Sequence, residues 1–450
     1  MFHDSSFAIS VPDDDADDPL RTRVRVKRKR KRNRAPTRSA TCWYFVRILC
    51  KFWPVAILIL LAASALLVFR ISNVHGERKN PKKVEPAKQE KKPSGNLNRL
   101  DPTTRMVHGV RERCLKILPP QEIDKLKIPP PREIALEDSF IRGSQFSPNL
   151  TEKTRFNLFT GYQTLEERER SFQVNHSSSV HCGFYSEEGG FRVSKDDNIF
   201  MKTCEIVVST CAFGGGDDLY QPIGMTTASL KRVCYVAFWD EITLSLQETK
   251  PGEDNFIGNW RIVIVRELPF SDQRLNGKIP KMLGHRLFPR ARYSIWVDSK
   301  SQIRRDPVGV IEAVLWREGA EMAISEHGAR SSVYEEAKAV VHKHKAGPEE
   351  VAAQVGQYER DGLPRDRRLW ARKGLNEASV IVREHTNRSN RLMCLWFNEV
   401  VRFTSRDQLS FPYVLWRMGD TLNVNVFPVC VRKDLVNSMG HLRKPKPLII

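Results

Sequence analysis

The sequence lacks the short motifs that mark many well-known catalytic and metal sites. None of its nine cysteines stands three positions from another, so there is no CxxC pair of the kind found in zinc knuckles. HExxH and GxSxG are both absent, which argues against a zincin protease and a nucleophile-elbow hydrolase. No GxxxxGK[ST] phosphate loop occurs, and the one glycine cluster, FGGGDD, lacks the third glycine of a dinucleotide fingerprint. Any active site must therefore be assembled from residues that lie apart in the sequence.

Negative charge is scarce, with 53 Asp and Glu against 73 Lys and Arg, and the formal net charge is +20. Most of this excess lies in two short segments, because residues 1–51 and 70–99 carry net charges of +7 and +6. These two segments flank an apolar run at residues 52–69, and basic segments beside a membrane span bind anionic lipid headgroups. The distribution predicts a bilayer as a partner and argues against nucleic acid.

Residues 52–69, FWPVAILILLAASALLVF, form the one long run without a charge. Eighteen helical residues cover about 27 Å, close to the thickness of the hydrocarbon core of a bilayer. Positive charge before the run predicts a type II signal anchor, with the later residues in the lumen of the secretory pathway. Its length is greater than that of a usual signal-peptide core. The short span favours Golgi membranes, with the endoplasmic reticulum as the alternative.

Cysteines and glycosylation sequons agree with this topology. Seven cysteines follow the span, where disulfides persist, and an odd number leaves at least one thiol outside an intramolecular pair. Three sequons also follow the span, at Asn149, Asn175 and Asn387. We expect all three to accept glycans.

Composition divides the chain into five parts. A basic cytosolic tail (1–51) and the span (52–69) precede a Lys- and Pro-rich lumenal stem (70–135) that cannot bury a core. A transitional segment (136–195) leads to a region with short apolar runs, which we expect to be the catalytic domain (196–445).

Short β-branched or aromatic runs in the last region predict strands buried on both faces. They are Glu205–Thr210, Val233–Phe238, Trp260–Val265, Tyr293–Val297, Glu321–Ser325 and Ala378–Val382. Helical stretches between them are Pro307–Arg317, Ser332–Lys345 and Asn390–Phe403. This alternation predicts an α/β fold with a largely parallel sheet, in which ligands bind beyond the carboxyl ends of the strands.

Carboxylates follow three of these strands. Asp217 and Asp218 come after three glycines at the end of the first strand, and Asp240 follows the second. Asp298 ends the fourth strand in WVDSK. Transferases that use nucleotide sugars often have Asp-x-Asp at this point, where two carboxylates hold Mn²⁺ or Mg²⁺ against the diphosphate. Here Lys300 takes the second position, and a lysine can neutralise a phosphate but cannot ligate the ion. Asp298 is therefore the single candidate metal ligand of this motif.

Other candidate residues lie in later loops. His327 and Arg330 precede a helix that starts with a capping box, at a position suited to an anion. A solvated capping loop is the alternative for these two residues. Glu399, Asp407 and Gln408 lie around the last two apolar helices and are candidates for catalysis or acceptor binding. The alternative for Asp407 is that it only caps the last helix.

Five segments occur in an order that resembles a known family: FGGGDDLYQPIG, CYVAFWDEIT, YSIWVDSK, HGARSSVYEEA and WFNEVVRFTSRDQLSFPYV. They are similar to the plant glycosyltransferase-like domain shared by the turgor-regulation-defect and mucilage-related proteins, over about residues 195–435. The resemblance implies a type II Golgi membrane protein with a single-sheet, GT-A-like domain behind its transmembrane helix, and with hexosyltransferase activity toward a cell-wall polysaccharide or glycoconjugate. It implies a nucleotide-sugar site at Asp217, Asp218, Asp240 and Asp298, with Asp407 and Gln408 facing the acceptor.

Two alternatives to sugar transfer stay open. One branch of that family is assigned alkaline ceramidase activity, which would make a lipid the substrate. That hydrolysis needs a metal-bound water or an activated nucleophile, and no motif of either kind is present. The second alternative is a non-catalytic scaffold that tethers other Golgi enzymes. Retained carboxylates after several strands favour an enzyme, which would use a nucleotide sugar and, if Asp298 binds it, Mn²⁺ or Mg²⁺.

Overall fold

The computed structural model describes residues 114–132, 155–173, 180–365 and 374–448. The predicted span at 52–69 lies outside these residues. Within them, no helix is both long and apolar enough to cross a bilayer. The sequons at Asn149 and Asn175 also lie outside the described segments.

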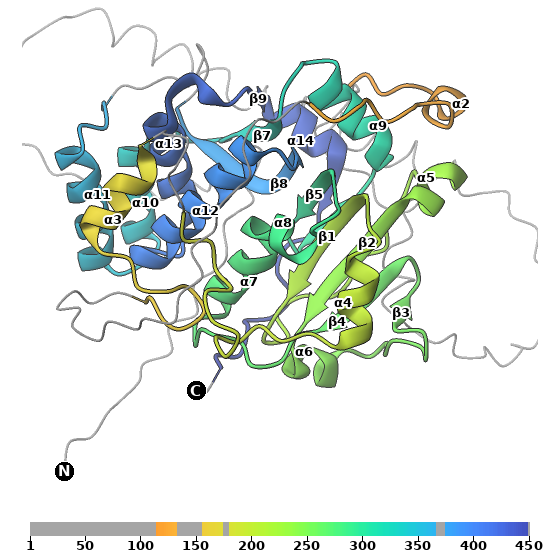
Figure 1. Cartoon of the computed structure of the whole chain (residues 1–450), viewed down its shortest axis with the longest axis horizontal. Helices are drawn as coiled ribbons and strands as arrows, with labels where there is room; N and C mark the ends of the chain where they lie inside the picture. The colour runs from red at the N-terminus through yellow and green to blue at the C-terminus, as the bar shows by residue number, and fades with distance from the viewer. Residues whose placement is uncertain (1–113, 133–154, 174–179, 366–373, 449–450) are drawn as a thin grey trace, which may run out of the picture. The chain divides into compact units, whose positions relative to one another are not determined.

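A mixed eight-stranded sheet forms the centre of the fold (Figure 1). All six predicted strands are present, and two further strands, β3 and β9, complete the edges. In spatial order the strands are β3 (Phe256–Ile257), β4 (Trp260–Ile264), β2 (Val233–Trp239), β1 (Ile206–Ala212), β5 (Tyr293–Val297), β8 (Asn376–Glu384), β7 (Met322–Glu326) and β9 (Val424–Phe427). Pairing is parallel from β4 to β5 and between β7 and β9, whereas β3 and β8 run the opposite way. The prediction of a largely parallel α/β sheet is confirmed in this coarse form.

Helices cover both faces of the sheet. The helices of at least six residues are α3 (Leu165–Phe172), α4 (Lys195–Met201), α5 (Thr227–Arg232), α6 (Glu241–Leu246), α7 (Gln273–Met282), α10 (Val333–His342), α11 (Pro348–Arg360), α12 (Asn387–Arg402), α13 (Asp407–Met418) and α14 (Val429–Leu435). Shorter elements are α2 (Pro120–Ile123), α8 (Gly284–Leu287), α9 (Pro307–Ile311), a π-helical turn (Glu312–Trp316) and a 3₁₀ turn (Gly419–Thr421). A second, two-stranded sheet pairs β6 (Ser301–Ile303) with β10 (Val436–Ser438). Figure 1 shows α3 and α10 to α13 gathered on the side of β8.

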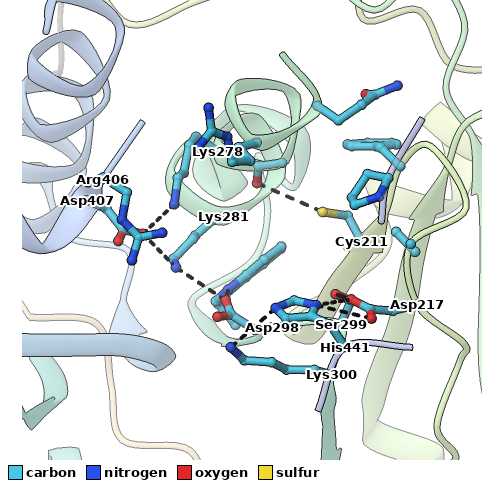
Figure 2. A pocket seen from close by; sticks show the side chains of 18 of the residues that line it. Cys211, Asp217, Lys278, Lys281, Asp298, Ser299, Lys300, Arg406, Asp407 and His441 are labelled. Atoms are coloured by element: carbon cyan, nitrogen blue, oxygen red, sulfur yellow. Dashed lines mark hydrogen bonds and ion pairs between the residues drawn. The ribbon is translucent and has the colours of Figure 1, made fainter. Parts of the chain in front are cut away.

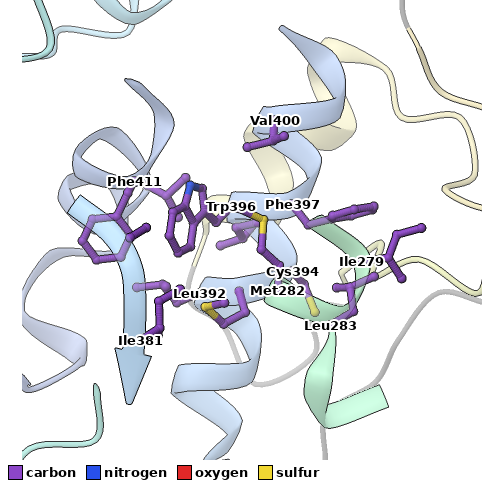
Figure 3. Close-up of a cluster of buried hydrophobic side chains, with 14 of the residues drawn as sticks. Ile279, Met282, Leu283, Ile381, Leu392, Cys394, Trp396, Phe397, Val400 and Phe411 are labelled. Carbon is purple, nitrogen blue, oxygen red and sulfur yellow. The ribbon is translucent and has the colours of Figure 1, made fainter. Parts of the chain in front are cut away.

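Two apolar clusters fill the space between the sheet and its helices. Successive residues of β1 belong to opposite clusters, with Val207 facing one and Val208 the other, as the alternation of a strand requires. The larger cluster packs α7 and α12 against the sheet, and Figure 3 shows side chains of both helices in it, among them Met282, Leu392 and Trp396. Full burial of such a side chain contributes about 1.5–3 kcal/mol. This cluster fixes α7, which matters because α7 forms one wall of the site described below.

Segments expected to be transitional or part of the stem also join these clusters. Phe159 and Phe172 are buried with the main core, and a disulfide joins Cys182 to Cys394 in α12. Ile123 of α2 packs in the second cluster. A second disulfide links Cys204 and Cys234, and Cys211 and Cys430 are free thiols. The packed domain therefore includes residues before position 196.

Candidate functional site

A cavity of about 280 Å³ opens beyond the carboxyl ends of β1 and β5 (Figure 2). These two strands are parallel neighbours, so the loops that follow them meet at one edge of the sheet. The cavity walls come from those two loops, from α7, from the residues that begin α13 and from the C-terminal segment around His441. This is the edge at which an α/β sheet binds ligands.

The glycine loop after β1 is shaped by contacts within the protein. Gly214 and Gly215 have φ values of +68° and +72°, which favour glycine. Their backbone N–H groups donate to Asp240 and Thr243 at 2.9 Å each. A Cβ on Gly214 would lie 2.5 Å from the carbonyl oxygen of Lys446. The glycines thus let the C-terminal segment pass closely over this loop.

Asp217 and the C-terminal segment form one side of the cavity. His441 Nδ1 lies 3.0 Å from Asp217 Oδ2, and the hydroxyl of Ser299 donates to the same carboxylate. His441 Nε2 lies 3.4 Å from Nζ of Lys300. Two of the predicted residues, Asp217 and Lys300, are therefore brought together through a histidine that the sequence analysis did not select.

Asp298 lies at the end of β5 and faces α7 across the cavity. Its Oδ1 accepts from the indole N–H of Trp296 at 2.8 Å and from Lys281 Nζ at 3.3 Å. The Asp298 side chain is 28% exposed, whereas that of Lys281 is only 6% exposed. Three lysines, of which Lys281 has the largest effect, lower the pKa of Asp298 against the opposing effect of burial. Asp298 is thus an anionic group open to the cavity.

Asp407, the first residue of α13, closes the opposite wall (Figure 2). Its Oδ2 accepts from Lys278 Nζ at 2.6 Å and from Lys281 Nζ at 2.8 Å. The two lysines hold the pKa of Asp407 far below its usual range although burial opposes this, so the carboxylate is ionised and bound from two sides. Such a group is a poor general base.

Lys278 and Lys281 respond differently to this arrangement. Burial lowers the pKa of Lys278, and the neighbouring Lys281 adds to that effect. Lys281 lies near both Asp298 and Asp407, which raise its pKa despite burial. The arrangement holds two ammonium groups against one shared carboxylate.

Gln408 also lines the cavity, as the sequence predicted. It is 8% exposed, and its Oε1 has no hydrogen-bond partner among the described residues. A buried amide oxygen without a partner costs free energy, so a ligand hydroxyl or amide donor at this position would be favourable. This arrangement fits the predicted acceptor-binding role of Gln408.

Other predicted residues are placed outside this cavity. Asp240 caps α6 and supports the glycine loop, with its Oδ1 accepting from Thr243 N at 2.8 Å. Asp218 binds the guanidinium of Arg443 and lines a small adjoining cavity with Trp239 and Trp260.

The loop residues His327 and Arg330 face each other instead of the cavity. His327 Nδ1 accepts from the backbone N–H of Arg330 at 2.9 Å, and the Arg330 guanidinium binds Glu336. Glu399 is buried in an ion pair with Arg168, whose Nε lies 2.6 Å from Glu399 Oε1. These contacts give His327, Arg330 and Glu399 structural roles.

The sequon at Asn387 lies at the first turn of α12. Its Nδ2 atom is buried, and the Ser389 that completes the triplet is fully buried with its hydroxyl bonded to the carbonyl of Glu384. A glycan on Asn387 does not fit the folded domain. The sequon alone predicts an exposed Asn387, because the sequence does not show which face of α12 packs against the rest of the domain.

Sequence reasoning missed Lys278, Lys281 and His441. The two lysines stand three residues apart and so share one face of α7. The helix itself was not predicted, because it contains Gly277 and Pro280 and both residue types disfavour helix interiors. His441 lies in a C-terminal segment without a regular pattern, so only tertiary contacts with Asp217 reveal its place.

The cavity residues do not form a ligand set for a divalent ion. Mg²⁺ requires near-octahedral oxygen donors, and a lysine ammonium offers none. Asp298 is already bound by Lys281 and Trp296, and Asp407 by two lysines. In the described part of the chain, only Cys182, His285 and Cys394 cluster as potential metal ligands, and the two cysteines are joined in a disulfide. The expected Mn²⁺ or Mg²⁺ site at Asp298 therefore has no geometric support.

A family model, the glycosyltransferase-like domain of TOD1/MUCI70, matches residues 140–441. The chain belongs to this family. It is 40% identical over 295 residues to "Probable hexosyltransferase MUCI70" from Arabidopsis thaliana, a match that covers 63% of this chain and 51% of that protein. It is 32% identical over 319 residues to "Alkaline ceramidase TOD1" from the same plant, covering 67% of this chain and 64% of that one. The chain thus spans about half to two thirds of the length of these relatives.

The family assignment confirms the resemblance predicted from five sequence segments, and the match begins earlier than expected, in the segment that supplies Phe159 and Cys182. A solved structure of mouse xyloside xylosyltransferase 1 is also similar, with a TM-score of 0.28 and 8% identity over 50% of this chain and 84% of that one. A likeness of this size does not establish a shared fold or activity.

Proposed function

We propose that this chain is a glycosyltransferase that moves a hexose from a nucleotide-sugar donor to a glycan or glycoconjugate acceptor. The observation that carries the proposal is the charge of the cavity at the ends of β1 and β5. Six basic and four acidic side chains line it: Arg274, Lys278, Lys281, Lys300, Lys345, Arg406, Asp217, Asp298, Asp407 and Glu377. A net positive cavity at this edge of an α/β sheet suits a diphosphate.

The roles divide between the two sides of the cavity. The lysines of α7 and Lys300 face the diphosphate of the donor. Asp298, which is partly exposed between them, accepts hydrogen bonds from ribose or sugar hydroxyl groups. Gln408, with its buried amide oxygen, faces the acceptor. Membership of the glycosyltransferase-like family and 40% identity to a probable hexosyltransferase support this assignment.

The site lies in the Golgi lumen in this proposal, behind a type II signal anchor at 52–69. The basic flank of the span and the two disulfides Cys182–Cys394 and Cys204–Cys234 support it, because disulfides persist in the secretory pathway. Protease added to sealed microsomes should then remove only the N-terminal tail. Digestion of the folded domain in sealed vesicles would contradict this topology.

The test of function is a donor panel. The purified full chain is incubated with UDP-, GDP- and ADP-sugars, each with a mixture of plant polysaccharide fragments, and separately with ceramide. We expect release of nucleoside diphosphate from one class of donor, dependent on an acceptor. Release of sphingosine without nucleotide release would replace the proposal with the hydrolysis that the name of one relative states. Absence of both products would favour a scaffold.

A further inference from the structure

Lys278 and Lys281 on α7 converge on a single carboxylate oxygen of Asp407. The distances from the two Nζ atoms to Asp407 Oδ2 are 2.6 and 2.8 Å. All three side chains are 14% exposed or less, so this group is held away from bulk water beside the cavity. Two cations on one anion leave a net positive charge that the protein keeps buried.

Burying this charge is costly unless a partner compensates it. Asp298, whose Oδ1 lies 3.3 Å from Lys281 Nζ, balances that single charge. The lining of the cavity as a whole still carries an excess of two positive charges, six basic against four acidic side chains, and Lys300 is among the basic ones. A doubly charged anion is the ligand that such an arrangement is prepared to receive.

The same residues are unsuited to a divalent cation. A cation near Asp298 would meet the ammonium of Lys281, and Lys300 stands where a second carboxylate ligand is usual in Asp-x-Asp sites. The lysines thus occupy the electrostatic position that a metal ion would hold.

We propose that Lys278 and Lys281, positioned by Asp407, act with Lys300 as the counter-charge of the departing nucleoside diphosphate, so that the site needs no divalent cation. This inference rests on the proposed function and deepens it. In the reaction, the bond between the anomeric carbon and the β-phosphate oxygen breaks, and its electron pair leaves with the diphosphate. The acceptor hydroxyl oxygen bonds to the anomeric carbon, and its proton passes to water. The lysines touch only the leaving phosphate, and Asp407 is a positioning residue.

The test is calorimetric titration of the full chain with UDP, GDP and ADP, in EDTA and then in Mn²⁺. We expect at least one nucleotide to bind with dissociation constants that differ by less than threefold between the two conditions. Binding that appears only with Mn²⁺ would overturn the inference while leaving the proposed function standing. If none of the nucleotides binds in either condition, the proposed function itself fails.

Variants locate the effect. Lys278→Met and Lys281→Met should each weaken binding in EDTA by at least tenfold, whereas Lys338→Met, at an exposed position of α10, should not change it. Lys300→Met provides a variant outside the shared Asp407 contact, in case loss of a lysine from α7 prevents folding. Asp407→Asn should weaken binding, and Asp407→Glu should recover part of it, a rescue that general destabilisation would not give. Unchanged affinity in folded Lys278→Met, Lys281→Met and Lys300→Met would contradict the inference.

Discussion

The ammonium group of Lys281 lies 3.3 Å from a carboxylate oxygen of Asp298, which links α7 to the end of β5 across the cavity. Neither α7 nor β5 alone forms a ligand-binding site. Their meeting places a partly exposed carboxylate beside buried cations, at the edge of the sheet where ligands are expected. The consequences of this contact can be tested residue by residue.

Asp298→Asn should lower sugar transfer by about a hundredfold or more, because loss of one preorganised electrostatic group typically costs about 3 kcal/mol in the transition state. The change keeps the size of the side chain, so the melting temperature should stay close to that of the wild type. Initial rates of nucleoside diphosphate release measure the effect. Asp196→Asn, at an exposed position in α4, is the matched control. Near-normal turnover in Asp298→Asn would remove this residue from the site.

Glu399→Gln should destabilise the fold by about 3 kcal/mol, because it leaves the buried guanidinium of Arg168 without its closest anionic partner. Urea unfolding monitored by circular dichroism measures this loss. Glu166→Gln, an exposed acid in α3, should change stability by less than about 0.5 kcal/mol. Activity per folded molecule should be unaltered in Glu399→Gln. A large loss of activity in a protein of wild-type stability would restore the catalytic role first suggested by the sequence.

Gly214→Ala should both destabilise the protein and weaken nucleotide binding. The substitution places a side chain at φ +68° and within 2.5 Å of the Lys446 carbonyl oxygen, so the C-terminal segment that carries His441 must move. Backbone strain of this kind costs about 1–3 kcal/mol. Gly319→Ala separates the two effects, because Gly319 has a similar φ of +62° and open space around its Cβ position. Equal nucleotide affinity in the two variants would show that the segment does not shape the cavity.

Acid should destabilise the domain from about pH 6.5 downward through His285. Burial, together with the nearby cations, above all Arg383, holds the pKa of His285 well below its ordinary value. The unfolded chain therefore binds a proton near pH 6.5 that the folded chain does not, and stability falls as the pH falls, by about 1.4 kcal/mol per pH unit for one such group. His285→Gln should reduce this slope relative to His342→Gln, an exposed control in α10. Urea midpoints at pH 7.0, 6.0 and 5.5 give the comparison, and identical slopes would contradict it.

The sequence predicts the six main strands because each is a continuous apolar run, and it predicts Asp217, Asp298 and Lys300 at the site because they follow such runs. Asp407 and Gln408 at the cavity are implied by the resemblance to the family. The sequence does not predict α7, whose Gly277 and Pro280 are tolerated only through packing against β1 and α12.

Pairing of charged and polar side chains inside the protein is the second feature that the sequence does not predict. Asp240, Glu399 and Arg330 are residue types common in active sites, but each of them binds another group of the protein. The partner of Glu399, Arg168, comes from a distant part of the chain, and spacing along the sequence does not reveal it.

The most direct test of the central claim is affinity labelling with periodate-oxidised nucleoside diphosphates. Their ribose dialdehyde forms a Schiff base with a nearby lysine, which borohydride reduction makes permanent and peptide mass spectrometry locates. We predict labelling at one or more of Lys278, Lys281, Lys300 and Lys345, the lysines that line the cavity, and protection by the unmodified nucleotide. Protectable labelling confined to lysines outside the cavity, such as Lys116 or Lys202, would contradict the assignment of this cavity as the donor site.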